Sequence, residues 1–159
     1  MALALAACDG AEPAAGNAQA SAGEGAAEYA ALIRQAREAV EDGDLADAGR
    51  LLERARALDP GNPAALVDIA RLKFRRGEHV VALAAAERAL ELGPEYAPAL
   101  LLRAQLVRDA HGLTPSLAWF EAAVAADPAD PVALAEYAAT LGDAGEHSRM
   151  LAVTRALTK

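Results

Sequence analysis

The stretch "DPGNPAAL" at residues 59–66 returns in altered form as "GPEYAPAL" at residues 93–100 and as "DPADPVAL" at residues 127–134. Its prolines Pro60, Pro94 and Pro128 lie 34 residues apart. The leucine that closes each stretch repeats with the same spacing. Because an unrelated sequence has no reason to repeat prolines and leucines at a fixed interval, the spacing predicts a structural unit of 34 residues.

The composition favours helices for this unit. The chain has 159 residues, of which 54% are hydrophobic, 4% aromatic and 24% charged. Much of the hydrophobic fraction is alanine, the residue with the highest helix propensity. A chain of this length can bury one sizeable core, so we expect one domain or one array. The net charge of −8 argues against binding to a nucleic-acid backbone, and no apolar run approaches the about 18 residues of a membrane-spanning helix.

Turn and capping signals divide each unit into two helices. With Tyr29 as position 1 of the first unit, position 15 is glycine in three units, where a helix must stop: Gly43, Gly77 and Gly145. The third unit has His111 there and Gly112 one residue later, so we expect its turn to be shifted. These signals predict helices without strands at about 29–42, 45–58, 63–76, 79–92, 97–110, 115–126, 131–144 and 147–158.

Small residues recur at fixed positions of the unit. Position 8 is always alanine, as Ala36, Ala70, Ala104 and Ala138, and position 27 is alanine in three units, as Ala55, Ala89 and Ala123. Together with the prolines at position 32, this pattern resembles the tetratricopeptide repeat family. The resemblance implies an all-α fold, a right-handed superhelical solenoid of about four antiparallel helix pairs. Its units would cover residues 29–62, 63–96, 97–130 and 131–159, the last unit being incomplete.

The N-terminal residues differ from the repeats. Residues 9–28 are rich in Ala, Gly and Ser, which predicts a flexible tether. Residues 1–8 end in Leu5-Ala6-Ala7-Cys8, which resembles a bacterial lipobox and implies lipidation of Cys8 and a membrane-anchored, periplasm-facing protein of the bacterial envelope. The alternative is an alanine-rich start with an incidental cysteine in a cytoplasmic protein, because the apolar run before Cys8 is short and lacks Lys and Arg.

The family resemblance also implies a binding groove lined by the first helix of each unit. The candidate residues are Ile33, Arg37, Val67, Arg71, Phe74, Arg75, Leu101, Gln105 and Arg108. Arg71 and Arg75 are like charges one helical turn apart, which is mildly unfavourable on an isolated helix. An acidic segment of another protein would compensate them; alternatively, Asp68 and Asp109 neutralise them within the array. The residues with which some family members clamp a chaperone tail are replaced here by Ile33, Asp68 and Pro98, so we do not expect that subclass.

No catalytic, metal or cofactor site is predicted. The three histidines, His79, His111 and His147, fall near turns without the spacing of a zinc ligand pair. No nucleophile elbow and no phosphate-binding glycine loop occur, and Trp119 is expected to pack within the array. We therefore predict a non-catalytic scaffold for protein–protein interaction, lipid-anchored in a bacterial envelope. The alternatives are an unanchored cytosolic adaptor and the N-terminal repeat segment of a longer protein with a catalytic domain.

Overall fold

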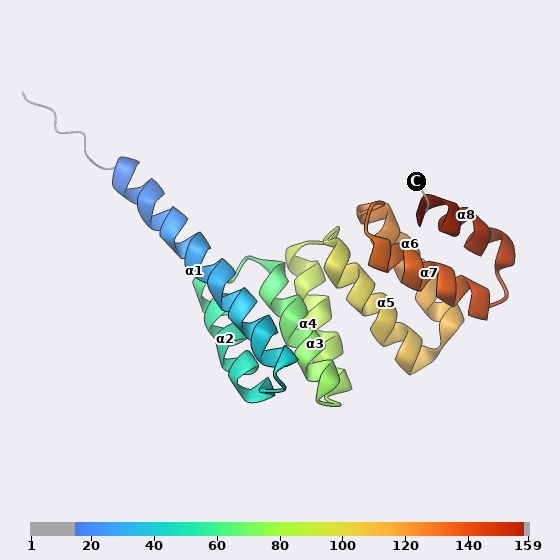
Figure 1. Ribbon diagram of the computed structural model, residues 1–159, viewed down its shortest axis with the longest axis horizontal. Helices are drawn as coiled ribbons and strands as arrows, with labels where there is room; N and C mark the ends of the chain where they lie inside the picture. Colours follow the sequence, from blue (N-terminus) through green and yellow to red (C-terminus); the bar gives the residue numbers. More distant parts are fainter. Residues whose placement is uncertain (1–14, 158–159) are drawn as a thin grey trace, which may run out of the picture.

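The described part of the protein, in a computed structural model, is an elongated array of helices (Figure 1). The structure describes residues 15–157, with side chains for residues 23–155 and 157. This part contains eight α-helices and no strand, which confirms the predicted all-α repeat array. The helices are α1 (Ala15–Glu41), α2 (Leu45–Leu58), α3 (Pro63–Arg75), α4 (His79–Leu92), α5 (Ala97–His111), α6 (Leu113–Ala126), α7 (Pro131–Asp143) and α8 (His147–Leu157).

Local capping explains why the helix boundaries follow the sequence signals. The carboxylate of Asp44 accepts a hydrogen bond from the backbone amide of Asp47 at 2.9 Å. The side-chain oxygen of Asn62 accepts one from the backbone amide of Ala64 at 3.0 Å. Such caps satisfy amides that have no partner inside the helix. All helices except α1 begin and end within two residues of the predicted bounds; α6 begins at Leu113 instead of residue 115.

The start of α1 differs from the prediction. We predicted a tether over residues 9–28 and a helix from residue 29, but residues 15–28 are helical. Once the packed part of α1 is nucleated, each further residue adds a hydrogen bond at little cost, and the alanines of this stretch propagate the helix well. Residues 9–14 and Cys8 lie outside the described residues.

Glycines with positive φ end the first helix of each unit. Gly43, Gly77 and Gly145 have φ of 83°, 76° and 80°, and in the third unit Gly112 has φ of 91°. This left-handed conformation is strained for residues with a Cβ. The shifted turn predicted for the third unit is therefore confirmed.

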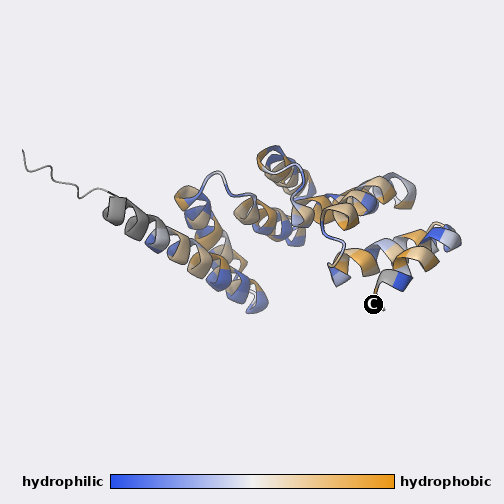
Figure 2. Ribbon diagram, turned by 90° about the horizontal axis from the view of Figure 1, so that it is seen from above, coloured by the Kyte–Doolittle hydropathy of each residue, from blue (hydrophilic) through white to orange (hydrophobic). Residues whose placement is uncertain are grey.

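The core runs along the array in successive clusters instead of forming one centre. The alanines at positions 8 and 27 are buried, and so is Phe120 at position 24. Small side chains let the helices approach closely, as in other close-packed helix pairs. Hydrophobic and hydrophilic residues alternate around the helices, with hydrophilic turns between them (Figure 2). Among the described residues, none of the helices combines the length and the hydrophobicity of a membrane-spanning segment.

Candidate partner-binding groove

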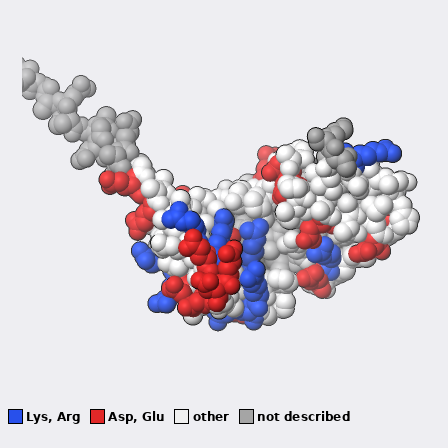
Figure 3. All heavy atoms as spheres, in the orientation of Figure 1, with Lys and Arg blue, Asp and Glu red and all other residues white. Residues whose placement is uncertain are grey.

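A groove of about 220 Å³ lies where α1, α2 and α3 meet. Apolar side chains and charged side chains of both signs line it: Ala36, Arg37, Val40, Glu41, Leu52, Asp68, Arg71, Leu72 and Arg75. On the face shown in Figure 3, acidic side chains gather over the C-terminal half of α1, and a band of basic side chains runs beside them. The groove therefore contains three of the four candidate arginines that the sequence pattern placed on first helices, Arg37, Arg71 and Arg75.

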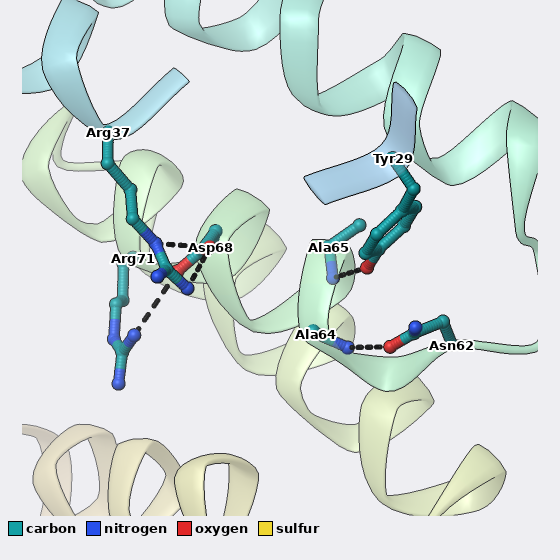
Figure 4. Close-up of polar contacts among 7 residues, drawn as sticks. All are labelled: Tyr29, Arg37, Asn62, Ala64, Ala65, Asp68 and Arg71. Carbon is teal, nitrogen blue, oxygen red and sulfur yellow. Dashed lines mark hydrogen bonds and ion pairs between the residues drawn. The ribbon is translucent and has the colours of Figure 1, made fainter. Parts of the chain in front are cut away.

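Asp68 is the centre of the polar contacts in this groove (Figure 4). Its side chain is 8% exposed. Arg37 of α1 donates to Asp68 Oδ2 from Nε at 3.0 Å and from Nη2 at 2.8 Å, and Arg71 Nη1 donates to Oδ1 at 3.2 Å. A carboxylate buried to this extent needs such partners, so Asp68 ties α1 to α3 and compensates both arginines in part.

A second network of the same kind joins α5 to α7. Gln105 Nε2 donates to Glu136 Oε1 at 3.2 Å. Arg108 Nη1 donates to Glu136 Oε2 at 2.7 Å and to Thr140 Oγ1 at 3.1 Å. In both networks, a residue at position 9 contacts a carboxylate at position 6 of the following unit, 31 residues further along the chain. The sequence analysis did not predict a role for Glu136, although a polar side chain at position 9 and an acid 31 residues later can be read from the sequence.

The joint between the second and third units lacks such a carboxylate. Position 6 of the third unit is Leu102, which is buried. Arg71 therefore contacts Asp68 on its own helix instead of an acid on α5. Within residues 15–157, the Arg75 side chain makes no ion pair or hydrogen bond. Positive charge on α3 is thus left without a carboxylate from α5.

The remaining candidate residues do not contribute their side chains to the groove surface. Ile33, Val67 and Leu101 are 7%, 1% and 4% exposed and belong to the core. Phe74 is half-buried, and its ring meets the His79 ring edge-on at 5.0 Å. The structure therefore brings together the candidate arginines Arg37, Arg71 and Arg75, and it uses most of the apolar candidates for packing.

Tyr29 fixes α1 on the first turn of α3. The amide of Ala65 donates to Tyr29 Oη at 3.0 Å (Figure 4). Burial raises the pKa of Tyr29 above its usual range, and the hydrogen bond from Ala65 opposes this shift. The neutral hydroxyl therefore serves as a structural acceptor between α1 and α3.

Trp119 contacts the array itself. Its ring lies 4.1 Å from the Arg103 guanidinium, and Arg103 Nη2 lies 3.2 Å from a carboxylate oxygen of Glu87 on α4. A cation over an aromatic face is an attractive contact, so Trp119 packs as expected. In the described part of the chain, no three His, Cys, Asp or Glu side chains are grouped to hold a metal ion.

Comparisons with known proteins agree with the repeat pattern. Residues 39–106 match the family model described as a tetratricopeptide repeat. No curated protein matches the sequence. The tetratricopeptide repeat resemblance is therefore supported over the matched segment.

Solved structures share the fold at low sequence identity. A crystal structure of MamA has a TM-score of 0.65 at 17% identity, over 82% of this chain and 76% of that chain. The first tetratricopeptide repeat domain of Spaghetti (RPAP3), bound to an HSP90 peptide, has a TM-score of 0.65 at 19% identity, over 74% of this chain and 96% of that chain. An O-GlcNAc transferase mutant from Thermobaculum terrenum has a TM-score of 0.65 at 23% identity, over 74% of this chain and 22% of that chain. These likenesses show the fold, a helical repeat solenoid.

Proposed function

We propose that this protein is a non-catalytic scaffold that binds an acidic segment of another protein in the groove between α1 and α3. Tetratricopeptide repeat domains bind peptide or protein partners, and the similar Spaghetti domain was solved with an HSP90 peptide. The fold alone does not select a partner. The chemistry of the partner is instead inferred from the charges in the groove.

The observation that carries the proposal is the positive charge of Arg71 and Arg75. These two side chains share one helix face, one turn apart, where like charges repel. Asp68 supplies one carboxylate for Arg37 and Arg71 together, while Arg75 has none within the described residues. An acidic side chain from outside would relieve this repulsion and gain charge-assisted hydrogen bonds.

Asp68 also limits what can bind. A partner that places a terminal carboxylate beside Arg37 would meet the negative charge of Asp68, which already occupies that guanidinium. We therefore propose that the acidic groups bind on the Arg75 side of the groove. The apolar atoms of Ala36 and Val40 would contact the backbone or a small side chain of the segment.

The test is a pull-down from native extract, followed by titration of the retained protein. The double variant Arg71→Ala, Arg75→Ala should weaken binding by about tenfold or more, since charge-assisted contacts contribute about 1.5–3 kcal/mol each. The affinity of the original protein should also fall as salt rises, because exposed charges are screened over about 8–10 Å.

A matched control removes two arginines outside the groove. Arg56 and Arg88 are exposed on second helices, and each pairs with an acid three residues away. The double variant Arg56→Ala, Arg88→Ala should bind the retained protein with unchanged affinity. Equal affinity of the groove variant and the original protein at low salt would exclude the groove as the binding site.

The lipid anchor is a separate proposal. It rests on the likeness of Leu5-Ala6-Ala7-Cys8 to a lipobox, and it would place the array at the bacterial envelope. Expression of the gene with its native upstream DNA in a bacterium fed labelled palmitate tests it. Label that is retained by the protein and lost in Cys8→Ser supports the anchor, whereas an unlabelled protein refutes it.

A further inference from the structure

A second hollow, of about 730 Å³, lies between α2 and α3. Its lining shares only Leu72 with the groove described above, which involves α1. Apolar atoms and four cationic side chains line it, together with one acid: Ala46, Gly49, Arg50, Glu53, Arg54, Ile69, Leu72, Lys73 and Arg76.

Gly49 opens this hollow. It occupies position 21 of the first unit, where the other three units have leucine: Leu83, Leu117 and Leu151. The hollow between α4 and α5, which contains Leu83, measures about 310 Å³. A Cβ at Gly49 would lie 3.5 Å from Leu72 Cδ2, which is ordinary contact. A leucine side chain is therefore missing from this joint, and the space it would take is open.

Three of the four cations around the hollow are also specific to this joint. Positions 22 and 26 of the first unit and positions 11 and 14 of the second carry Arg50, Arg54, Lys73 and Arg76. The equivalent residues of the next joint are Ala84, Arg88, Val107 and Ala110, and those of the last joint are Ala118, Ala122, Leu141 and Ala144. The missing leucine and the added cations thus coincide at one place in the array.

Three of these cations are available to a ligand. Arg50, Arg54 and Arg76 are 76%, 64% and 46% exposed, and each pairs with an acid that does not line the hollow. Exposed pairs of this kind contribute little to stability, so a carboxylate from a partner can replace them. Glu53, the acid in the lining, is already bound by Arg56 at 2.8 Å.

We propose that this hollow is a second docking site, for an acidic peptide segment that carries one bulky apolar side chain. That side chain takes the place of the missing leucine and covers Ile69 and Leu72, while flanking carboxylates bind the arginines of α2 and α3. A side chain projecting from a narrow backbone reaches between two helices, whereas a flat bilayer surface does not. The site is independent of the groove between α1 and α3.

The experiment titrates the full chain, labelled with ¹⁵N, with the peptide Glu-Asp-Glu-Leu-Glu-Asp-Glu. Amide shifts should change at Gly49 and Ile69 and around them at a lower peptide concentration than any change around Val40 in the groove. The same peptide with alanine in place of leucine should bind at least about tenfold more weakly, because burial of a leucine side chain drives the docking. No shift change at up to about 1 mM peptide overturns the proposal.

The variant Gly49→Leu restores the pattern of the other units and fills the hollow. It should fold at least as well as the original protein, because leucine is a better helix former than glycine, and its thermal midpoint should not fall. Its affinity for the peptide should drop at least about tenfold. Arg71→Ala, Arg75→Ala should leave the affinity measured from the Gly49 amide unchanged, which separates the hollow from the groove.

Two results would overturn the proposal. Equal affinity of Gly49→Leu and the original protein shows that the peptide binds elsewhere and overturns the proposal. Co-sedimentation with phosphatidylglycerol vesicles that is lost in Gly49→Leu, without peptide binding, overturns it in favour of an anionic membrane surface.

Discussion

Replacing Phe120 by alanine should destabilise the C-terminal half of the array by about 3–5 kcal/mol. Phe120 is the largest of the fully buried side chains, with 0% exposure. Its ring stacks with Tyr137 of α7 at a centroid distance of 6.3 Å, and the Arg108 guanidinium lies 5.3 Å from it. The substitution therefore leaves a cavity at the joint of α5, α6 and α7, and it removes an aromatic contact of about 0.5–1.5 kcal/mol, which the total above includes.

Such a loss is a large part of the about 5–15 kcal/mol by which domains are stable. Units of a repeat array contact only their neighbours, so the effect should be local at first. We expect α7 and α8 to unfold at lower urea concentration than the N-terminal helices. The transition of the variant should then have two steps or a lower slope.

Urea denaturation followed by circular dichroism and by tryptophan fluorescence measures both effects. The chain has one tryptophan, Trp119, directly beside Phe120, so its fluorescence reports on this joint, while circular dichroism reports on all helices. Thr154 occupies the same position 24 in the last unit but is exposed, so Thr154→Ala should change stability by less than about 0.5 kcal/mol. A loss below about 1 kcal/mol for Phe120→Ala would refute the assignment of position 24 to the core.

Three further predictions concern α1 and the tyrosines. Tyr29→Phe should cost about 1–3 kcal/mol in urea denaturation, because the buried amide of Ala65 loses its acceptor; an unchanged midpoint would contradict this. The pKa values of Tyr29, Tyr96 and Tyr137 are raised, mainly by burial. The stability that these neutral hydroxyls contribute is therefore complete below the usual pKa of about 10 and is lost as the pH rises through their higher folded-state pKa values. The urea concentration at the unfolding midpoint should fall as the pH is raised from about 9 to about 11. In hydrogen exchange, the amides of residues 15–27 should exchange faster than those in the rest of α1, because the described side chains there are mostly exposed and an unpacked helix is only marginally stable. Equal protection of the two parts would show that this stretch docks on another surface.

The local features of this fold were predictable because they depend on residues close together in sequence. Asn62 caps the helix that Pro63 begins, and Gly43 provides the left-handed turn between α1 and α2. Capping and turn formation act within one helical turn, so their signals lie within a few letters of the sequence. The early start of α1 was missed because alanine-rich sequence is compatible with both a tether and a helix that propagates from a packed end.

The candidate groove was predictable only in part. The repeat pattern placed Arg37, Arg71 and Arg75 on first helices, and the structure brings them to one groove. It also placed Val67 and Leu101 on the groove surface, but the structure buries both. Which side of a helix becomes surface depends on how closely the next unit packs, and a single unit does not contain that information.

The sequence by itself determined the 34-residue unit, its two helices and the small residues of its core, since these follow from propensity, capping and periodicity. Only the tertiary structure decided which charges neutralise each other and which remain. Asp68 binds Arg37 from the preceding unit, Glu136 does the same for Gln105 and Arg108, and Leu102 leaves the joint between them without an acid. In the sequence, Gly49 is one small residue among many, and only the structure shows that its missing side chain leaves an open hollow. The physical reason is that charge compensation and cavities depend on distances between different units, which are set when the units stack.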